Sequence, residues 1–524
     1  MPKIMKVSGP PGCGKTTYLL SQIEKACHKY EPSRIGAISF TKAAVEEMRD
    51  RMKNVLGYSG KSSRNIRTIH SHGFRLLGLD KKDIVDGKNK HIKSWNEAFP
   101  RWALPVDGPG IELEDEPGII SYEQGNNVKI HQAMEILRNR SFPVDRWEIS
   151  EPNGLGRAAA LFWKDWSHFL EENGLWDFTK ILEETKRLQL RPDIDVLFID
   201  ECQDLSRLQL DITRIWAEQC DSVIYIGDAD QALYRFAGAS PEDFRDLVHE
   251  WGNVLKQSYR VPKEVYDYAI KLIRKIKDRE DVDYLPTDKA GRFLNADEYP
   301  KLELPGSHMI LCRCNYHLKR WITYLIDKGI PWKNHYRLKN KAWNPASTKT
   351  WMAVKTYNQI KKGQEVIGEE IIRMIEKMTK EYLVRGVKTH RKKLIEESCG
   401  YYGSVDIFYL NSSGLFQPDF FNFKEPVGRV FNLTGYAGVL INRHGTKVVD
   451  QEPECTIGTT HSVKGGEADH VWVDLSTSYK IALAMQGSMV ARADEIRVGY
   501  VACTRARETL GLLQGDRSSN HVFG

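Results

Sequence analysis

The eight residues GPPGCGKT, Gly9 to Thr16, constrain this chain more than any other feature, because they match the pattern GxxxxGK[ST] in the setting that it requires. The apolar stretch KIMKVS before them predicts a buried strand, and TYLLSQIEKAC after them has the apolar spacing of a helix. A glycine-rich turn between strand and helix lets backbone N–H groups surround a phosphate. We therefore predict a nucleotide-binding loop in which Lys15 reaches the β- and γ-phosphates and the Thr16 hydroxyl binds Mg²⁺. The predicted nucleotide contacts of this loop are Gly9, Gly12, Gly14, Lys15, Thr16 and Thr17.

The stretch LFIDECQDLS, Leu197 to Ser206, places two adjacent acids directly after an apolar run. Taken alone, Asp200 and Glu201 fit either the polar end of a buried strand or a carboxylate pair that acts on a metal and a water. The phosphate loop favours the second interpretation, because such folds share Mg²⁺ between the loop hydroxyl and an acid at the end of a neighbouring strand. We expect Asp200 to bind Mg²⁺ together with Thr16, and Glu201 to orient or deprotonate the attacking water.

Strand-like and helix-like segments alternate from the start of the chain, which is typical of a parallel sheet covered by helices. Further strands are expected at 195–200, 222–228 and 308–314, and two irregular, largely helical stretches interrupt the alternation. A chain of 524 residues is also too long for one core. We therefore predict an α/β protein of two parallel-sheet domains, each with a mainly helical insertion. The expected bounds are 1–77 with 192–250 for the first domain, 78–191 for its insertion, 251–340 with 431–524 for the second domain, and 341–430 for its insertion.

Cysteine usage and hydropathy exclude several classes of protein. The nine cysteines are scattered, without a CxxC pair or a Cys/His block at zinc spacing, so we expect reduced thiols and no structural zinc. No apolar run approaches the ~18 residues of a membrane span. The first residues, MPKIMKVSG, lack the apolar core of a signal peptide. These features predict a cytoplasmic protein.

The charge distribution leaves one question open. A net charge of +6 permits an anionic partner without requiring one. Between Lys355 and Lys393 there are eleven Lys or Arg residues against five Asp or Glu residues. This excess fits either a solvated helical face or a contact surface for nucleic acid.

Seven segments beyond the phosphate loop resemble, in the right order, the motifs of UvrD/Rep/PcrA-type superfamily 1 helicases. They are ISFTKAAVEEMRDRM (38–52), TIHSHGF (68–74), DECQD (200–204), IGDADQALYRFAGA (226–239), QSYR (257–260), THSVKGGEADHV (460–471) and YVACTRAR (500–507). The resemblance implies two RecA-like domains with the nucleotide in the cleft between them. The two insertions match the family only in position.

The resemblance also implies roles for individual residues. Gln203 and Gln231 would contact the γ-phosphate or its water, and Arg260 and Arg505, both expected on the second domain, would bind the phosphoryl charge. Tyr259 would stack on the base and Glu467 would contact the ribose, while Gln22 stands where relatives usually carry an arginine beside the base. The expected DNA contacts are Phe40, Thr41, His70, Tyr234, Phe236, His461 and Lys464. For Phe40 and Tyr234, a place in the hydrophobic core is the alternative.

The sequence departs from the family pattern at Ala237, Gly466 and Ile496, and only eight residues precede Gly9, so we expect the glutamine contact to adenine that relatives make upstream of the loop to be missing. The hydrolysis residues are intact, so the resemblance implies an ATP- and Mg²⁺-dependent translocase on single-stranded DNA that unwinds duplex 3′ to 5′. The alternative is a DNA-stimulated ATPase that remodels protein–DNA complexes or drives a nuclease or defence assembly. Expected partners are single-stranded DNA, single/double-strand junctions and accessory replication, repair or nuclease proteins, with the chain itself a monomer.

Overall fold

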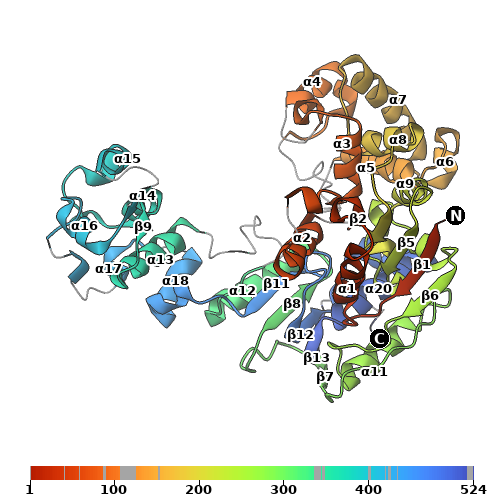
Figure 1. Cartoon of the computed structure of the whole chain (residues 1–524). Helices are drawn as coiled ribbons and strands as arrows, with labels where there is room; N and C mark the ends of the chain where they lie inside the picture. The colour runs from red at the N-terminus through yellow and green to blue at the C-terminus, as the bar shows by residue number, and fades with distance from the viewer. Residues whose placement is uncertain are drawn as a thin grey trace. The chain divides into compact units, whose positions relative to one another are not determined.

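The computed structural model describes residues 2–39, 42–57, 60–85, 90–106, 125–151, 154–334, 344, 348–398, 403–418, 420–422, 427–433, 435–515 and 523. The chain forms two compact units. The first comprises Met1–Ala290 and Ala484–Thr504, and the second comprises Gly291–Leu483 and Arg505–Gly524. Each unit contains one parallel sheet and one group of helices inserted into the α/β part of the chain (Figure 1).

The first unit contains a six-stranded sheet in the order β3-β2-β4-β5-β1-β6, in which every neighbouring pair is parallel. Short runs of β-branched and aliphatic residues form its central strands, which are buried as expected for a sheet covered on both faces. The strands are β1 (Lys3–Ser8), β2 (Ile35–Ile38), β3 (Ile66–Arg67), β4 (Val196–Ile199), β5 (Ser222–Gly227) and β6 (Trp251–Val254). The accompanying helices are α1 (Lys15–Cys27), α2 (Lys42–Leu56), α3 (Ile69–Leu76), α9 (Arg207–Ala217), α10 (Pro241–Arg245), α11 (Lys263–Ile273) and α20 (Met489–Cys503).

The helical insertion of the first unit has an aromatic core. Trp95, Trp147, Phe162 and Trp166 are each at most 1% exposed. The Arg138 guanidinium is buried beside them, where it forms ion pairs with three carboxylates and therefore satisfies the donors that burial removes from water. The helices are α4 (Lys90–Ala98), α5 (Asn126–Asn139), α6 (Trp147–Ser150), α7 (Gly156–Glu172) and α8 (Phe178–Arg187).

The second unit contains a five-stranded sheet in the order β11-β8-β12-β13-β7, again with parallel neighbours only. Its strands are β7 (Arg292–Asp297), β8 (His308–Cys312), β11 (Cys455–Thr459), β12 (Ala468–Asp474) and β13 (Ala506–Leu513), and it is accompanied by α12 (Leu318–Lys328). Helix α19 (Tyr479–Gly487) begins in the second unit and ends in the first. The α/β class with two parallel sheets is thus confirmed.

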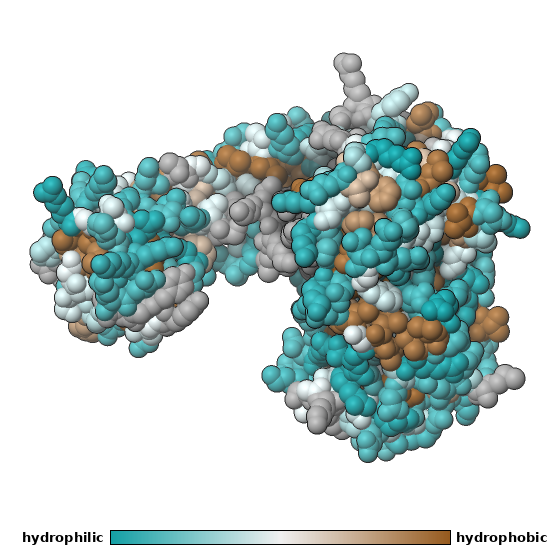
Figure 2. All heavy atoms as spheres, turned by 90° about the horizontal axis from the view of Figure 1, so that it is seen from above, coloured by the Kyte–Doolittle hydropathy of each residue, from teal (hydrophilic) through white to brown (hydrophobic). Residues whose placement is uncertain are grey.

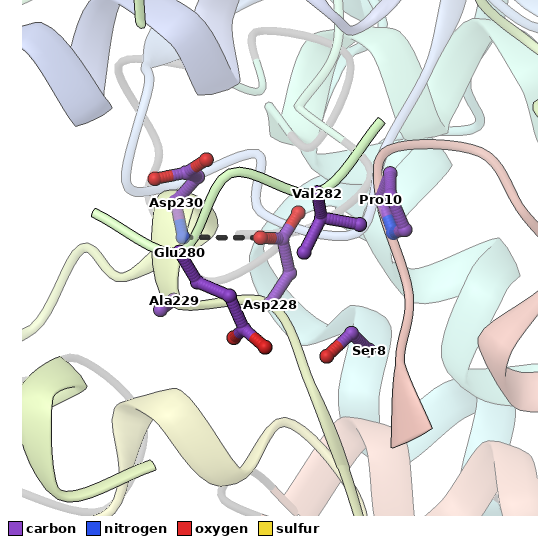
Figure 3. Close-up of a pocket in the computed structure, with 7 residues that line it drawn as sticks. All are labelled: Ser8, Pro10, Asp228, Ala229, Asp230, Glu280 and Val282. Atoms are coloured by element: carbon purple, nitrogen blue, oxygen red, sulfur yellow. Dashed lines mark hydrogen bonds between the residues drawn. The ribbon is translucent and has the colours of Figure 1, made fainter. Parts of the chain in front are cut away.

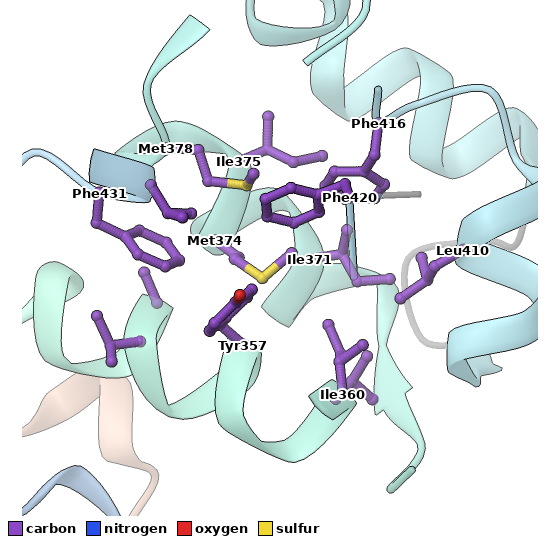
Figure 4. Packing of buried hydrophobic residues seen from close by; sticks show 14 of the residues in the cluster. Tyr357, Ile360, Ile371, Met374, Ile375, Met378, Leu410, Phe416, Phe420 and Phe431 are labelled. Carbon is purple, nitrogen blue, oxygen red and sulfur yellow. The ribbon is translucent and has the colours of Figure 1, made fainter. Parts of the chain in front are cut away.

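The helical insertion of the second unit packs around a separate apolar core, in which Tyr357, Phe416, Phe420 and Phe431 surround methionine and isoleucine side chains (Figure 4). The core continues to Val449, beyond the expected end of the insertion at residue 430. The elements are α13 (Lys349–Lys361), α14 (Gly368–Lys377), α15 (Val387–Ser398), α16 (Ile407–Ser412), α17 (Val427–Val430), α18 (Gly435–His444) and the short antiparallel pair β9 (Val366–Ile367) and β10 (Ser404–Val405).

The expected boundary at residue 250 also differs from the structure. Residues 251–290 and 484–504 group with the first unit. The physical reason is pairing: β6 forms hydrogen bonds along the edge of β1, and α11 packs against α20. The sequence pattern does not reveal this edge strand, because its partner β1 lies far earlier in the chain, at Lys3–Ser8 against Trp251–Val254.

The visible surface is mostly hydrophilic, with smaller hydrophobic areas between the charged and polar side chains (Figure 2). Among the described residues, no helix combines the length and the apolar character that crossing a membrane requires.

Candidate nucleotide-binding site

The loop between β1 and α1 has the conformation that its glycines predict. Gly12 and Gly14 have φ angles of 71° and 76°, in the left-handed region that glycine adopts without strain. The Lys15 Nζ donates a hydrogen bond to the Gly9 carbonyl at 2.8 Å, so this side chain lies along the loop. A Cβ atom on Gly9 would lie 2.3 Å from Lys15 Cγ, which explains the glycine at this position. The loop therefore surrounds the start of α1 in the manner of a phosphate-binding site.

The acid pair follows β4, as the sequence predicts, but β4 does not neighbour the loop strand. In the sheet, β5 lies between β4 and β1, which corrects the expectation of adjacent strands. Asp200 is 4% exposed, and its Oδ1 accepts the backbone N–H of Glu201 at 3.0 Å. Glu201 has a φ angle of 49°, unusual for a residue with a side chain. Because all three strands are parallel, their carboxyl ends lie at the same edge of the sheet.

The intervening strand β5 brings a further acid, Asp228, to this edge. Its carboxylate accepts a hydrogen bond from Gln231 Nε2 at 2.6 Å and another from the backbone N–H of Asp230 at 3.0 Å. Its own backbone N–H donates to Gln203 Oε1 at 2.9 Å. The Nε2 atom of Gln203 in turn donates to Glu201 Oε2 at 2.5 Å. The structure thus brings both predicted glutamines and the predicted water-activating acid into one network.

Asp228 was not among the expected site residues, although a signal was present in the sequence. It follows an apolar strand directly and precedes Gln231 by three positions, just as Asp200 follows β4 and precedes Gln203 by three. Two polar residues in this spacing after two strands of one parallel sheet predict a shared edge.

The electrostatics of this edge follow from its burial. Loss of solvation, followed by the repulsion of Asp230, raises the pKa of Asp228 to about 7, while the Lys15 ammonium group opposes the shift. Burial also raises the pKa of Asp230, although its ion pair with Arg279 at 2.8 Å lowers that pKa in part. Asp228 and Asp230 line a small cavity beside the phosphate loop, together with Ser8, Pro10, Ala229, Glu280 and Val282 (Figure 3).

Tyr259 and Arg260 lie beside the loop, in the first unit. The backbone N–H of Tyr259 donates to the Gly12 carbonyl at 2.8 Å, and the Tyr259 side chain is 76% exposed. A Cβ on Gly12 would lie 2.4 Å from the Arg260 Cβ, so the two backbones approach closely. The expectation that Arg260 comes from the second domain is therefore wrong, because β6 and the segment after it pack with the first sheet.

Other expected nucleotide contacts are distributed between the units. Arg505 and Glu467 belong to the second unit. Arg505 is 3% exposed and donates to the Gly466 carbonyl at 3.3 Å, whereas Glu467 is exposed and pairs with Arg507 at 3.3 Å. Gln22 is half-buried on α1 in the first unit.

The expected DNA contacts have mixed surroundings. Tyr234 is 2% exposed and packs in a cluster with Val498 and Val501. Its ring therefore lies in the hydrophobic core, which was the alternative, and the expected base stacking is not supported. His70 is half-buried, with its ring edge-on to Phe178 at 5.9 Å. The remaining residues are Phe236, half-buried beside Tyr234; His461, buried, and Lys464, half-buried, both in the second unit; and Phe40 and Thr41, which lie outside the described residues.

The oxygen donors at this edge fit a divalent cation of the Mg²⁺ type. Thr16 supplies a hydroxyl at the start of α1, and Asp200 supplies a carboxylate after β4. Across the part of the chain that the structure describes, no group of three or more His, Cys, Asp or Glu side chains is placed to enclose a metal. Mg²⁺ suits a site of this kind, because it usually takes one or two protein ligands and completes its shell with phosphate and water.

A parallel sheet with a phosphate loop on one strand and acids and glutamines on the adjoining strand ends defines a P-loop nucleotide-binding protein. Residues 2–251 match the family described as the UvrD/REP helicase N-terminal domain. A probable DNA helicase II homolog from Mycoplasma capricolum is 25% identical over 307 residues, which cover 55% of this chain and 41% of that protein. The ATP-dependent DNA helicase Rep of Buchnera aphidicola (Baizongia pistaciae) is 24% identical over 372 residues, 63% of this chain and 53% of its own.

A third relative, the ATP-dependent DNA helicase PcrA of Bacillus subtilis, is 26% identical over 292 residues, which cover 51% of this chain and 37% of PcrA. Residues 2–251 therefore match the UvrD/REP helicase N-terminal domain, and the chain is similar to helicases of the UvrD, Rep and PcrA type over about half of its length. The matches span only about half the length of these relatives or less.

Proposed function

We propose that the chain is an ATP-dependent motor that translocates on single-stranded DNA and separates duplex 3′ to 5′. The observation that carries this proposal is the edge of the first sheet, where the phosphate loop, the acid pair and both glutamines lie at neighbouring strand ends. The relatives named as ATP-dependent DNA helicases carry the DNA half of the proposal. The polarity comes from the motif resemblance alone.

In this proposal the loop N–H groups and Lys15 bind the phosphates, and Tyr259, exposed beside the loop, stacks on the base. Thr16 and Asp200 would hold Mg²⁺, which neutralises charge on the phosphates when bound. Glu201 accepts a proton from the attacking water, and Gln203 holds the Glu201 carboxylate in place through the 2.5 Å hydrogen bond. Arg260 and Arg505 supply guanidinium groups for the charge that develops on the transferred phosphoryl group.

The second helical insertion supplies a candidate contact for the nucleic-acid backbone. An open hollow is lined by Thr379, Lys380, Lys388, Asn432 and Asn442, among others. Burial lowers the pKa of Lys388, and the positive charges of Lys380, Arg391 and Lys377 lower it further. A concentration of positive charge around hydrogen-bonding side chains suits phosphate groups and favours the nucleic-acid interpretation of the basic segment.

The first test measures ATP hydrolysis with and without single-stranded DNA, followed by unwinding of duplexes with a 3′ or a 5′ tail. We expect hydrolysis to rise with single-stranded DNA and unwinding to require the 3′ tail. Unwinding from 5′ tails alone would contradict the polarity, and hydrolysis indifferent to DNA would contradict the motor. Lys380→Ala should weaken binding to tailed duplex and leave hydrolysis without DNA unchanged, with the exposed Lys319 on α12, outside the basic segment, substituted as the matched control.

The second candidate is a DNA-stimulated ATPase that remodels protein–DNA complexes without separating strands, alone or as the motor subunit of a nuclease or defence assembly. The burial of Tyr234 favours it, because an aromatic ring in the core cannot hold an unpaired base. Hydrolysis stimulated by DNA, together with no strand separation on short tailed duplexes, would select this candidate.

A further inference from the structure

Asp228 stands at the centre of the hydrogen-bond network beside the phosphate loop. One carboxylate oxygen accepts from Gln231 Nε2 at 2.6 Å, and the other accepts from the backbone of Asp230 at 3.0 Å. Its backbone N–H donates to Gln203 Oε1 at 2.9 Å, and Gln203 Nε2 donates to Glu201 at 2.5 Å. One residue therefore contacts both glutamines, one through its side chain and one through its backbone.

These contacts determine which end of each amide faces which neighbour. Gln203 lies between a backbone donor and a carboxylate acceptor, so only one orientation of its amide satisfies both. Gln231 meets a carboxylate, which accepts only from the NH₂ end. The oxygen of the Gln231 amide is thereby directed away from Asp228.

Packing around Asp228 leaves little room for alternatives. The neighbouring acid Asp230 is bound by Arg279 at 2.8 Å, and both side chains are at most 8% exposed. The residue before Asp228 is Gly227, whose carbonyl accepts the N–H of Gly9 at 2.8 Å and so connects β5 to the phosphate loop. A Cβ on Gly227 would lie 2.5 Å from Gln203 Oε1, so the glutamine occupies the space that a side chain would take.

We propose that Asp228 is a positioning residue for nucleotide hydrolysis, which orients the Gln231 amide directly and the Glu201 carboxylate through Gln203. This inference rests on the proposed ATPase function. A water held between Glu201 and Gln231 would be aligned by two groups whose positions both depend on contacts with Asp228. Loss of the Asp228 carboxylate then disturbs Gln231, and displacement of Gln203 from the Asp228 backbone disturbs Glu201, while the loop that binds the phosphates stays intact.

The test substitutes Asp228→Asn, which keeps the size of the side chain but turns one acceptor into an NH₂ group that faces a donor. We expect kcat for ATP to fall by ~10- to 100-fold, and KM and the affinity for a fluorescent ATP analogue to change by less than ~3-fold. The acid at the opposite end of β5, Asp221, is exposed, and Asp221→Asn should behave as wild type. If the wild-type protein has no ATPase activity, the proposed function is contradicted. If the wild type is active and Asp228→Asn has the same kcat, this inference is overturned.

A double-mutant cycle separates positioning from a structural role. If Asp228 acts through Gln231, then Asp228→Asn combined with Gln231→Ala should lower kcat by no more than ~3-fold beyond the more damaging single variant. If the double variant instead lowers kcat by the product of the two single effects, the two residues act independently and the inference is overturned. Gly227→Ala offers a second route, because its Cβ displaces Gln203, and with it the contact to Glu201, while the identity of every carboxylate is unchanged. It should lower kcat with nucleotide affinity retained, and normal turnover in this variant, with thermal unfolding unchanged, would equally refute the proposal.

Discussion

The two parallel sheets each carry an acid at the end of a central strand, and the partners of those acids differ. In the first unit, Asp228 follows β5 and accepts from a glutamine that also belongs to the candidate site. In the second unit, Asp474 ends β12 and accepts from the Trp321 indole at 2.6 Å and the Ser476 backbone at 2.7 Å. Position in the fold is therefore not sufficient to identify a functional acid, and the chemistry of its partners is needed.

The surroundings of the two acids confirm this difference. Asp474 is 3% exposed, and Trp321, its partner on α12, is completely buried. Nearby Cys312, at the end of β8, is buried as well, and burial followed by the charge of Asp474 raises the pKa of its thiol well above the ordinary value. Asp474 is therefore surrounded by packed side chains. At the corresponding edge of the first sheet, a cavity lies beside the loop and Tyr259 is exposed.

The largest effect expected from this comparison concerns Lys15. Lys15→Ala removes the ammonium group that we propose binds the phosphates, so ATP hydrolysis should fall by at least ~100-fold while the fold is retained. The measurement is phosphate release at saturating single-stranded DNA, with thermal unfolding as a check on folding.

Lys25 provides the control for this variant, because it is an exposed lysine on the same helix α1, and Lys25→Ala should hydrolyse ATP as wild type does. Unchanged turnover in Lys15→Ala would show that the edge of the first sheet is structural as well, and the comparison between the two sheets would then fail.

A smaller effect, on stability alone, is expected for Asp474→Asn. The amide keeps one acceptor oxygen but turns an NH₂ group toward a buried donor, which should lower the free energy of unfolding by about 1 to 3 kcal/mol. Urea unfolding measures the loss, and ATP hydrolysis per folded molecule should not change. Asp327→Asn, on the exposed side of α12, is the matched substitution that should leave stability unaltered. If Asp474→Asn instead lowered kcat in a stable protein, the second sheet would have a catalytic edge too.

The sequence predicts features that depend on residues close together in the chain, such as the phosphate loop. It does not predict features that depend on distant segments, such as strand order and the burial of single side chains. The loop from Gly9 to Thr16 and the acids after β4 were predicted because strand, turn and helix follow one another directly. The place of β5 between β4 and β1 depends on pairing between remote strands, which no local pattern contains. The burial of Tyr234 depends on α20, which joins the first unit from near the end of the chain.

The same dependence on partners distinguishes two histidines on one helix, α3. His70 is half-buried at the surface, whereas His72 is 1% exposed, lies edge-on to Trp216 at 5.2 Å and places Nε2 3.3 Å from the Asn65 carbonyl. Burial is the main reason that the pKa of His72 falls to about 3, and nearby arginines add to the effect. His72 is therefore a neutral, packed side chain within a motif whose first histidine was the expected DNA contact.

This difference gives the smallest of the three predictions, a dependence of stability on pH. Below a pH of about 6.5 the unfolded chain binds a proton on His72 that the folded chain does not bind until about pH 3, so stability falls as the pH falls through this range. Between pH 7 and pH 5 the loss from this residue should be about 1 to 2 kcal/mol. His72→Gln, which keeps a donor for Asn65, should remove that part of the loss, whereas the same substitution at exposed His28 should not. Urea unfolding at pH 7 and pH 5 measures the loss in each protein. If wild type and His72→Gln lose the same stability, His72 is accessible to protons and the TIHSHGF segment opens to solvent.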